Sequence, residues 1–177
     1  ANQEKNERAF NLYLQMQEKG QLPDVMTFAS VLKAFGNATT LQNGKRIHSQ
    51  VYREVFDESE IVVATALIDM YGKCGAITEA ENVFGTLFQR DVVAWNALIA
   101  GYAQYQLDNE ALKCFRQMQN EGFSPDVVTF TCILKACASI CSLKIEECIH
   151  RDIKKSGLLR NDVILGNSLD DMYAKCG

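Results

Sequence analysis

Cysteine and histidine are the residues of this chain that could hold a metal ion or act as nucleophiles. The chain has seven cysteines and two histidines among 177 residues, and its closest group is Cys137, Cys141, Cys148 and His150. These are ligand types of a zinc site, but the chain has no CxxC pair and the two histidines lie 102 residues apart. We therefore interpret them as small apolar side chains packed between helices, and we predict no metal and no cofactor.

A disulfide framework is the other chemistry that seven cysteines suggest. Such frameworks belong to small secreted domains with an even number of cysteines, whereas the number here is odd. The first residues, ANQEKNER, are polar and do not resemble a secretory leader. We therefore expect reduced thiols.

The composition favours a soluble, largely helical protein. Apolar residues make up 47% of the chain, there are two prolines, and no apolar run is long enough for a membrane span. Eighteen basic side chains stand against 22 acidic ones, which gives a net charge of -4. This balance excludes a nucleic-acid binder that is basic over its whole surface, but it allows a local basic groove.

A long internal repeat indicates how these residues are positioned. The segment QMQEKGQLPDVMTF at 15–28 returns as QMQNEGFSPDVVTF at 117–130, and ALIDMYGKCG at 66–75 returns as SLDDMYAKCG at 168–177. Both displacements are 102 residues, and residues 1–75 share about 24 identities with residues 103–177. This shift is too long for one supersecondary unit, so a finer period must lie within it.

The finer period is marked by an acidic residue, two apolar residues and then an apolar face. Successive markers are 36, 31, 35 and 36 residues apart, at Asp24, Glu60, Asp91, Asp126 and Asp162. Each interval has room for two amphipathic helices of about a dozen residues, with the acid placed to cap the next helix. Such pairs bury their apolar faces only by stacking on neighbours, which predicts an all-α solenoid.

The 35-residue interval shows the expected faces most clearly. Gly122 and Pro125 are expected to end its second helix. The residues expected to be apolar contacts are Val93, Leu98, Ile99 and Tyr102 in the first helix and Ala111, Leu112, Phe115 and Met118 in the second.

Units of 36, 31 and 35 residues, in this order along the chain, resemble the long, short and standard units of pentatricopeptide repeat proteins of the PLS subclass, found mainly in land plants. Residues 134–159 look like an L unit, 96–126 like a P unit and 65–84 like an S unit. The resemblance implies a right-handed superhelical α-solenoid of helix-turn-helix repeats, and we expect a fragment of a longer array. The implied units are a partial P unit at 1–24, an L unit at 25–60, an S unit at 61–91, a P unit at 92–126, an L unit at 127–162 and a partial S unit at 163–177.

The resemblance implies sequence-specific binding of single-stranded RNA, about one nucleotide per unit, in an RNA editing or processing factor of a mitochondrion or chloroplast. In the family, the fifth and last residues of a unit face the base, and the second residue wedges between bases. The implied base-recognising residues are Thr65, Asp91, Asn96, Asp126, Thr131, Asp162 and Asn167, and the implied wedges are Val62, Val93 and Val128.

The family's code assigns a base to two of these pairs. Thr65 with Asp91 prefers G, and Asn96 with Asp126 prefers U. A carboxamide offers a donor and an acceptor to a pyrimidine, and a carboxylate accepts from a ring N–H. Residues of these types near a helix start are also ordinary caps, and the sequence leaves both roles open.

Two further contacts are implied. Lys73 and Lys175 recur at one phase of the two S units, where the family can contact phosphate and where a cation also suits a helix C-terminus. The first L unit fits the code poorly, because Ala29 cannot hydrogen-bond a base. In the family, L units are associated with editing-cofactor proteins of the MORF type, which adds a possible protein partner.

We expect no catalysis, no small-molecule substrate and no membrane contact. Many PLS proteins end in a deaminase-like domain that needs an HxE…CxxC zinc site, and neither half is present. His48 and His150 occupy equivalent positions in the two L units, which favours a repeated packing role. The alternative is a protein-interaction scaffold of the tetratricopeptide kind, which would use a uniform period of about 34 residues.

Two residues depart from the repeat. Asp170 stands where Ile68 stands one superperiod earlier, so we expect a carboxylate on a packed face and a gain in stability from Asp170→Ile. Glu146 replaces Gly44 of the first L unit.

Overall fold

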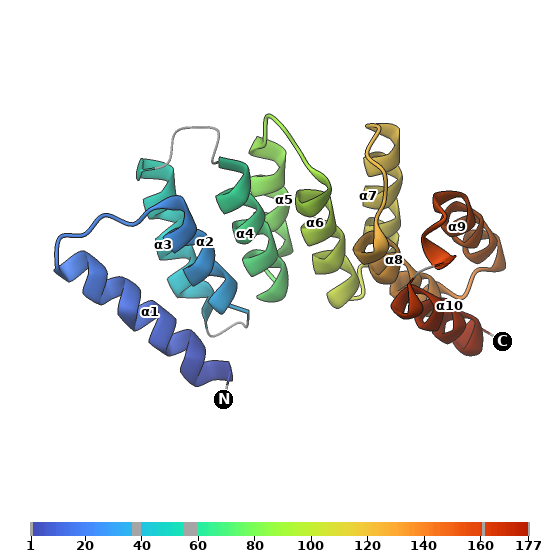
Figure 1. Cartoon of the computed structure of the whole chain (residues 1–177), viewed down its shortest axis with the longest axis horizontal. Coiled ribbons are helices and arrows are strands. Elements are labelled where there is room, and N and C mark those ends of the chain that lie inside the picture. The colour runs from blue at the N-terminus through green and yellow to red at the C-terminus, as the bar shows by residue number, and fades with distance from the viewer. Residues whose placement is uncertain (1, 37–39, 55–59, 161, 177) are drawn as a thin grey trace. The chain divides into compact units, whose positions relative to one another are not determined.

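The computed structural model describes residues 2–36, 40–54, 60–160 and 162–176. Within these ranges it contains ten α-helices, one short 3₁₀ helix and no strand (Figure 1), which confirms the predicted all-α fold. The elements are α1 (Asn2–Glu18), α2 (Val25–Ala34), α3 (Leu41–Glu54), α4 (Glu60–Lys73), α5 (Ile77–Thr86), α6 (Val92–Gln104), α7 (Asp108–Asn120), α8 (Val127–Ile140), α9 (Leu143–Ser156), η2 (Leu158–Arg160) and α10 (Val163–Cys176).

The chain divides into two compact units, Ala1–Arg90 and Asp91–Gly177. In the first unit, α2 packs on α1, α3 and α4, and α4 also packs on α3 and α5. In the second unit, α8 packs on α6, α7, α9 and α10. Within each unit, therefore, the first helix of one helix pair packs directly on the first helix of the next. Assignment of the pairs to L, S and P types stays a prediction.

The acidic markers begin the first helices. The side chains of Asp24, Asp91, Asp126 and Asp162 each accept a hydrogen bond from the backbone N–H three residues later, at 2.7, 2.7, 2.9 and 2.8 Å. This N-cap satisfies a backbone donor that has no partner inside the helix. The marker spacing thus has a structural cause, because these four markers cap the helices that follow them and the fifth, Glu60, is the first residue of α4.

A glycine ends α7, as the sequence predicts. Gly122 has a φ of +87°, in the left-handed region where a side chain would be strained, and Gly20, one superperiod earlier, has a φ of +72°. The N–H of Phe123 reaches back to the carbonyl of Met118 at 3.0 Å. This pattern satisfies an orphan carbonyl at the helix end and turns the chain toward the next unit.

The expected apolar faces of α6 and α7 are buried, with one exception. Leu98, Ile99 and Tyr102 are buried, as are all four residues expected on α7. Val93 is 60% exposed, so its expected place in the core is wrong. The side chains four and seven positions later, Ala97 and Ala100, are only partly buried, so Val93 begins a stripe of α6 that helix packing leaves open.

The structure also corrects the expectation for Asp170. Ile68 is fully buried, whereas Asp170 is exposed. Helix α5 packs on α4, but in the described part of the chain no later helix packs on α10. The carboxylate therefore lies in solvent, and the stabilisation expected from Asp170→Ile loses its physical basis.

The interpretation of the cysteines holds only in part. Cys137 is buried, as a packed thiol would be, but Cys141 and Cys148 are exposed. All seven cysteines are unbonded thiols in the structure. The packing interpretation is therefore wrong for these two residues.

Candidate RNA interface

The three predicted wedge residues are exposed apolar side chains at the same position of successive first helices. Val62 on α4, Val93 on α6 and Val128 on α8 are 45%, 60% and 53% exposed. Each is the second residue after an acidic marker, so helix geometry puts it in the first turn, beside the cap. Apolar surface that recurs at one structural position while facing solvent is typical of a surface that binds a partner.

Two further residues occupy this position and were missed by the sequence reasoning. Met26 on α2 is 64% exposed, and Ile164 on α10 is 66% exposed. Counting two residues forward from Asp24 and Asp162 would have found both. With them, an exposed apolar residue marks the start of five first helices.

Asn96 and Asp126 form the best defined predicted pair. The Asn96 amide nitrogen donates to both carboxylate oxygens of Asp126, at 3.0 and 3.1 Å. Thr129, which the sequence reasoning did not select, donates its hydroxyl to the Asn96 carbonyl oxygen at 2.5 Å. Thr129 is fully buried, and its backbone N–H is capped by the same Asp126 carboxylate. The pair therefore belongs to a hydrogen-bonded triad that joins α6 to α8.

The triad accounts for most of the hydrogen-bonding capacity of the Asn96 amide. Asn96 is only 7% exposed, and its carbonyl oxygen and its nitrogen each have a partner within the triad. A base would therefore bond to the small remaining capacity of the Asn96 amide, or share or replace one of these partners. Thr129 corresponds to Thr27 in the first compact unit, whose hydroxyl donates to Asp24 at 2.6 Å. A threonine three residues after the acidic marker was therefore the sequence signal that could have predicted a hydroxyl bonded to the marker carboxylate.

Thr65 and Asp91 lie in different compact units. Thr65 is half-buried in the second turn of α4, and Asp91 caps α6. Their joint recognition of one base stays a prediction.

The second L pair is bonded locally. The Thr131 hydroxyl donates to the carbonyl of Val127 at 2.7 Å, within α8. Asp162 caps the N–H of Leu165 at 2.8 Å. Asn167 is exposed on α10, and it lines a surface hollow together with Asp162 and Arg160. Asp162 and Asn167 thus line the same hollow. Thr131 and Asp162 do not bond to each other in the described contacts, because each bonds to the backbone at the start of its own helix.

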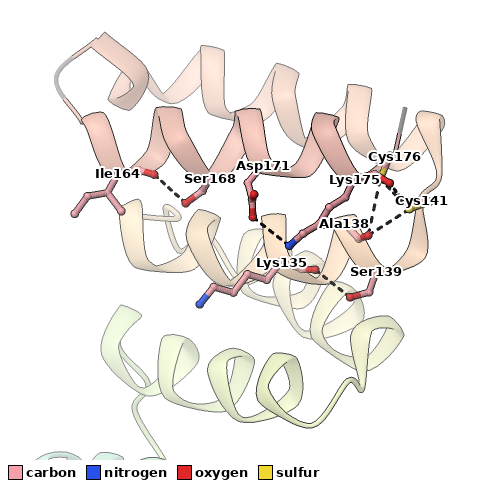
Figure 2. A network of polar contacts seen from close by, with 9 residues as sticks. All are labelled: Lys135, Ala138, Ser139, Cys141, Ile164, Ser168, Asp171, Lys175 and Cys176. Atoms are coloured by element: carbon pink, nitrogen blue, oxygen red, sulfur yellow. Dashed lines mark hydrogen bonds and ion pairs between the residues drawn. The ribbon is translucent and has the colours of Figure 1, made fainter.

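Both predicted phosphate-contacting lysines are held by a carboxylate one turn earlier. Lys73 donates to Asp69 at 2.5 Å, and Lys175 donates to Asp171 at 3.1 Å (Figure 2). Their side chains remain 43% and 59% exposed. A carboxylate four residues before a lysine is a favourable but weak surface pair. A phosphate could therefore compete for either ammonium group.

The two histidines make the same contact one superperiod apart. Nδ1 of His48 lies 2.8 Å from the hydroxyl of Tyr71, and Nδ1 of His150 lies 2.7 Å from that of Tyr173. Each contact ties the second helix of one helix pair to the first helix of the next, α3 to α4 and α9 to α10. Burial lowers the pKa of His48, and burial together with Lys154 lowers that of His150. Their geometry agrees with a repeated packing role.

No group of three or more side chains suited to a metal ion occurs among the residues that the structure describes. Within the same ranges, no helix has the length and apolar character that crossing a membrane requires.

Three family models match the chain. They are the PPR repeat family at residues 90–139, the pentatricopeptide repeat domain at 1–38 and the PPR repeat at 62–92. The three matches together cover more than half of the chain. The chain therefore belongs to the pentatricopeptide repeat family.

Its relatives include three proteins of Arabidopsis thaliana. Pentatricopeptide repeat-containing protein At2g13600 is 37% identical over 96% of this chain and 24% of its own length. The putative mitochondrial pentatricopeptide repeat-containing protein At3g13770 is 39% identical over 96% of this chain and 27% of its own length. The chloroplastic protein At2g02980 is 37% identical over 95% of this chain and 28% of its own length. The chain thus spans about a quarter of the length of these relatives.

Solved structures show the same fold. The pentatricopeptide repeat protein PPR10, in complex with an 18-nt psaJ RNA element, matches with a TM-score of 0.75 and 21% identity over 91% of this chain and 24% of that one. Nuclear proteinaceous RNase P 2 from A. thaliana matches with a TM-score of 0.65 and 12% identity over 97% of this chain and 40% of that one. The helix pairs described above are therefore those of a pentatricopeptide repeat solenoid.

Proposed function

We propose that this chain binds single-stranded RNA along the starts of its first helices, with about one nucleotide per unit. The observation that carries the proposal is the exposed apolar residue at the same position of successive first helices, seen at Val62, Val93 and Val128. A base offers a flat apolar face to such a side chain, and stacking of this kind tolerates every base. The complex of PPR10 with RNA supports the proposal, since that protein shares the fold.

Base choice would come from the polar residues beside these apolar ones. Asn96 and Asp126 lie within hydrogen-bonding distance of each other and have amide and carboxylate groups that match base edges. Thr65 with Asp91, Thr131 with Asp162, and Asn167 are proposed for the same role by their place in the repeat. Because the net charge is -4, attraction to phosphate must be local, and Lys73 and Lys175 are the proposed sources.

The finer assignment follows from the unit lengths. We propose that the units are of the PLS type and that the chain is the recognition part of an organelle RNA editing or processing factor without catalytic activity of its own. The mitochondrial and chloroplastic names of two relatives support an organelle location. The L units, with Ala29 at a base-reading position, are proposed to contact a MORF-type protein.

The test is a binding titration with a randomised single-stranded RNA of about a dozen nucleotides. A double variant, Val93→Asp with Val128→Asp, should weaken binding by at least about tenfold, because it removes two stacking contacts and adds two charges that repel phosphate. Leu143→Asp is the matched control, since Leu143 is 71% exposed on a second helix, away from the proposed surface. It should change affinity less than about twofold beyond the effect of one added charge.

Duplex RNA of the same length should bind more weakly than the single strand, because paired bases cannot be wedged apart. Equal losses in the control and the double variant would contradict the proposed surface. If neither RNA binds and the variants melt like the parent, the chain alone does not have the proposed activity.

A further inference from the structure

Two cysteine sulfurs meet at the C-terminal ends of α8 and α10. Sγ of Cys176 lies 3.0 Å from Sγ of Cys141 (Figure 2). Cys141 is exposed, and Cys176 is partly exposed. The RNA-binding proposal does not involve either thiol.

The backbone holds the two thiols in place. Cys141 is the C-cap of α8 and has left-handed torsion angles, with φ 48° and ψ 55°. Its sulfur lies 3.3 Å from the carbonyl oxygen of Ala138, and the Cys176 sulfur lies 3.9 Å from the same oxygen. A shared acceptor on α8 thus keeps both sulfurs on one side of the α8 terminus.

The missing further ligands, rather than the sulfur separation, count against a bridging metal. Two thiolates of a tetrahedral zinc site lie about 3.8 Å apart, since each zinc–sulfur bond is about 2.3 Å, but no group of three or more metal-binding side chains occurs in the described part of the chain. A disulfide needs about 2.05 Å, so the two sulfurs need to approach by only about 1 Å.

A buried carboxylate lies beside the pair. Glu146 on α9 is 1% exposed, and its carboxylate lies against the Cys176 thiol. The hydrogen bond to Cys141, burial, and the hydrogen bond and negative charge of Glu146 raise the pKa of Cys176 to about 12. Cys176 is therefore held as a thiol, and the exposed Cys141 is the sulfur that an oxidant meets first.

The first compact unit provides an internal comparison. Cys74 is the equivalent of Cys176, but its sulfur lies 3.9 Å from the hydroxyl of Thr40. The residue equivalent to Cys141 is Thr39, and the residue equivalent to Glu146 is Gly44. The second L unit thus has both the second thiol and the carboxylate, and the first L unit has neither.

We propose that Cys141 and Cys176 form a reversible intramolecular disulfide when the chain meets a disulfide oxidant such as oxidised glutathione. The Cys141 thiolate attacks one sulfur of the oxidant, which forms a mixed disulfide and releases one glutathione thiolate. The Cys176 thiol then passes its proton to the glutathione thiolate already released, and its sulfur attacks Sγ of Cys141 and expels the second glutathione thiolate, which takes up the proton that Cys141 had lost to water. Two protein thiols are oxidised, and one glutathione disulfide is reduced to two thiols.

The bond would lock α8 to α10. These two helices already pack on each other, and the new ring would enclose α9 and η2. Closing this ring restricts the unfolded chain, so oxidation should raise the thermal midpoint by roughly 5–10 °C, and a dithiol reductant should reverse the rise.

The experiment treats the whole chain with oxidised glutathione and measures its intact mass and its peptide map. The expected product is the monomer less two hydrogen atoms, with Cys141 joined to Cys176. Cys141→Ser and Cys176→Ser should each abolish this product. Cys148→Ser is the matched control, because Cys148 is exposed on α9, and this variant should form the disulfide like the parent.

Other products would overturn the proposal. These are a stable glutathione adduct on Cys141 in the parent, a disulfide that includes Cys148, or disulfide-linked dimers. Retention of one zinc or copper ion per reduced chain, lost in both the Cys141→Ser and Cys176→Ser variants, would instead identify a metal site. A Cys141→Ser variant that no longer folds would be replaced by Cys141→Ala, with the same mass measurement.

Discussion

Asn96 and Asp126, the two residues assigned to one base, are hydrogen-bonded to each other in the structure, at 3.0 and 3.1 Å. The same carboxylate caps α8 through the backbone N–H of Thr129. The sequence leaves base recognition and helix capping open as alternatives for these residues. The structure shows that the Asp126 carboxylate caps α8 while it also orients the Asn96 amide, and base recognition by this pair stays a prediction.

Glu146→Gln should stabilise the chain. Its carboxylate is buried beside the Cys176 thiol, and an amide of the same shape is less costly to bury than a carboxylate. We expect a gain of about 1–3 kcal/mol in the free energy of unfolding, measured by urea denaturation of the reduced protein. Glu147→Gln, at an exposed neighbouring site, should change it by less than about 0.5 kcal/mol. A loss of stability in Glu146→Gln would show that the carboxylate has a stabilising partner.

The free energy of unfolding should decrease as the pH is lowered through the range where histidines titrate. Burial lowers the pKa of His48 below its ordinary value of 6.5, so the unfolded state binds a proton that the folded state still refuses. The histidine contribution to the free energy of unfolding is therefore fully present above about pH 6.5, falls as the pH drops from 6.5 toward the lower folded-state pKa, and levels off below it. Unfolding curves at about pH 7.5 and about pH 5.5 measure this loss.

His48→Gln should reduce that loss, and His150→Gln should also contribute because the pKa of His150 is lowered too. The double variant should have the flattest pH profile. An unchanged profile in the double variant would assign the loss to other groups.

The repeat period predicted the fold, because four of the five marker acids are N-caps and the fifth, Glu60, is the first residue of α4, so the marker spacing sets the helix starts. Asp24, Asp91, Asp126 and Asp162 all cap a helix, and such a cap is a local property of a few residues. The exposed valines were also predicted, through the family resemblance. Periodicity alone placed Val93 in the core, because an apolar residue on the partner-binding face looks like a core residue in a helical pattern.

The contacts between helices could not be predicted from the sequence pattern. Asp170 was expected to be packed because the apolar Ile68 stands at the same phase of the repeat, but burial depends on a neighbouring helix and not on that phase. The contact of Cys141 with Cys176 joins residues 35 positions apart, and no short-range sequence pattern predicts it. Thr129 was missed because threonine is common in helix starts, and its contact to Asn96 crosses between helices.

Lys73→Ala should reduce the salt dependence of RNA binding. If the ammonium group neutralises one phosphate, the slope of log K against log salt should become shallower by about 0.7, the value for a single strand. Asp69→Ala removes the carboxylate that now holds Lys73, so it should strengthen binding and keep the slope. Lys113→Ala is the control, since Lys113 is 79% exposed on a second helix. A parental slope in Lys73→Ala would leave this lysine with its helix-end role.

The sharpest prediction concerns base choice. If the array runs parallel to its RNA, as in the family, Thr65 and Asp91 take a G immediately 5′ of the U that Asn96 and Asp126 take. Asn96→Thr makes the second pair the same as the first, so the preferred base at that nucleotide should change from U to G. The carboxamide that matches a uracil edge is lost, while Val93, Val128 and the backbone contacts are unchanged. The expected shift in relative affinity corresponds to about 1–3 kcal/mol.

Competition between GU and GG versions of one oligonucleotide, with parent and variant, measures this shift directly. Asn96 also accepts from Thr129, so a thermal melt of the variant must show that α6 and α8 still pack before its binding is compared. Asn109→Thr is the matched control, because Asn109 is exposed on α7 and should not alter base choice. If the folded Asn96→Thr variant ranks the two RNAs as the parent does, Asn96 only braces Asp126 and Thr129. RNA contact would then depend on the exposed apolar residues, and base choice at this unit would lie with other side chains.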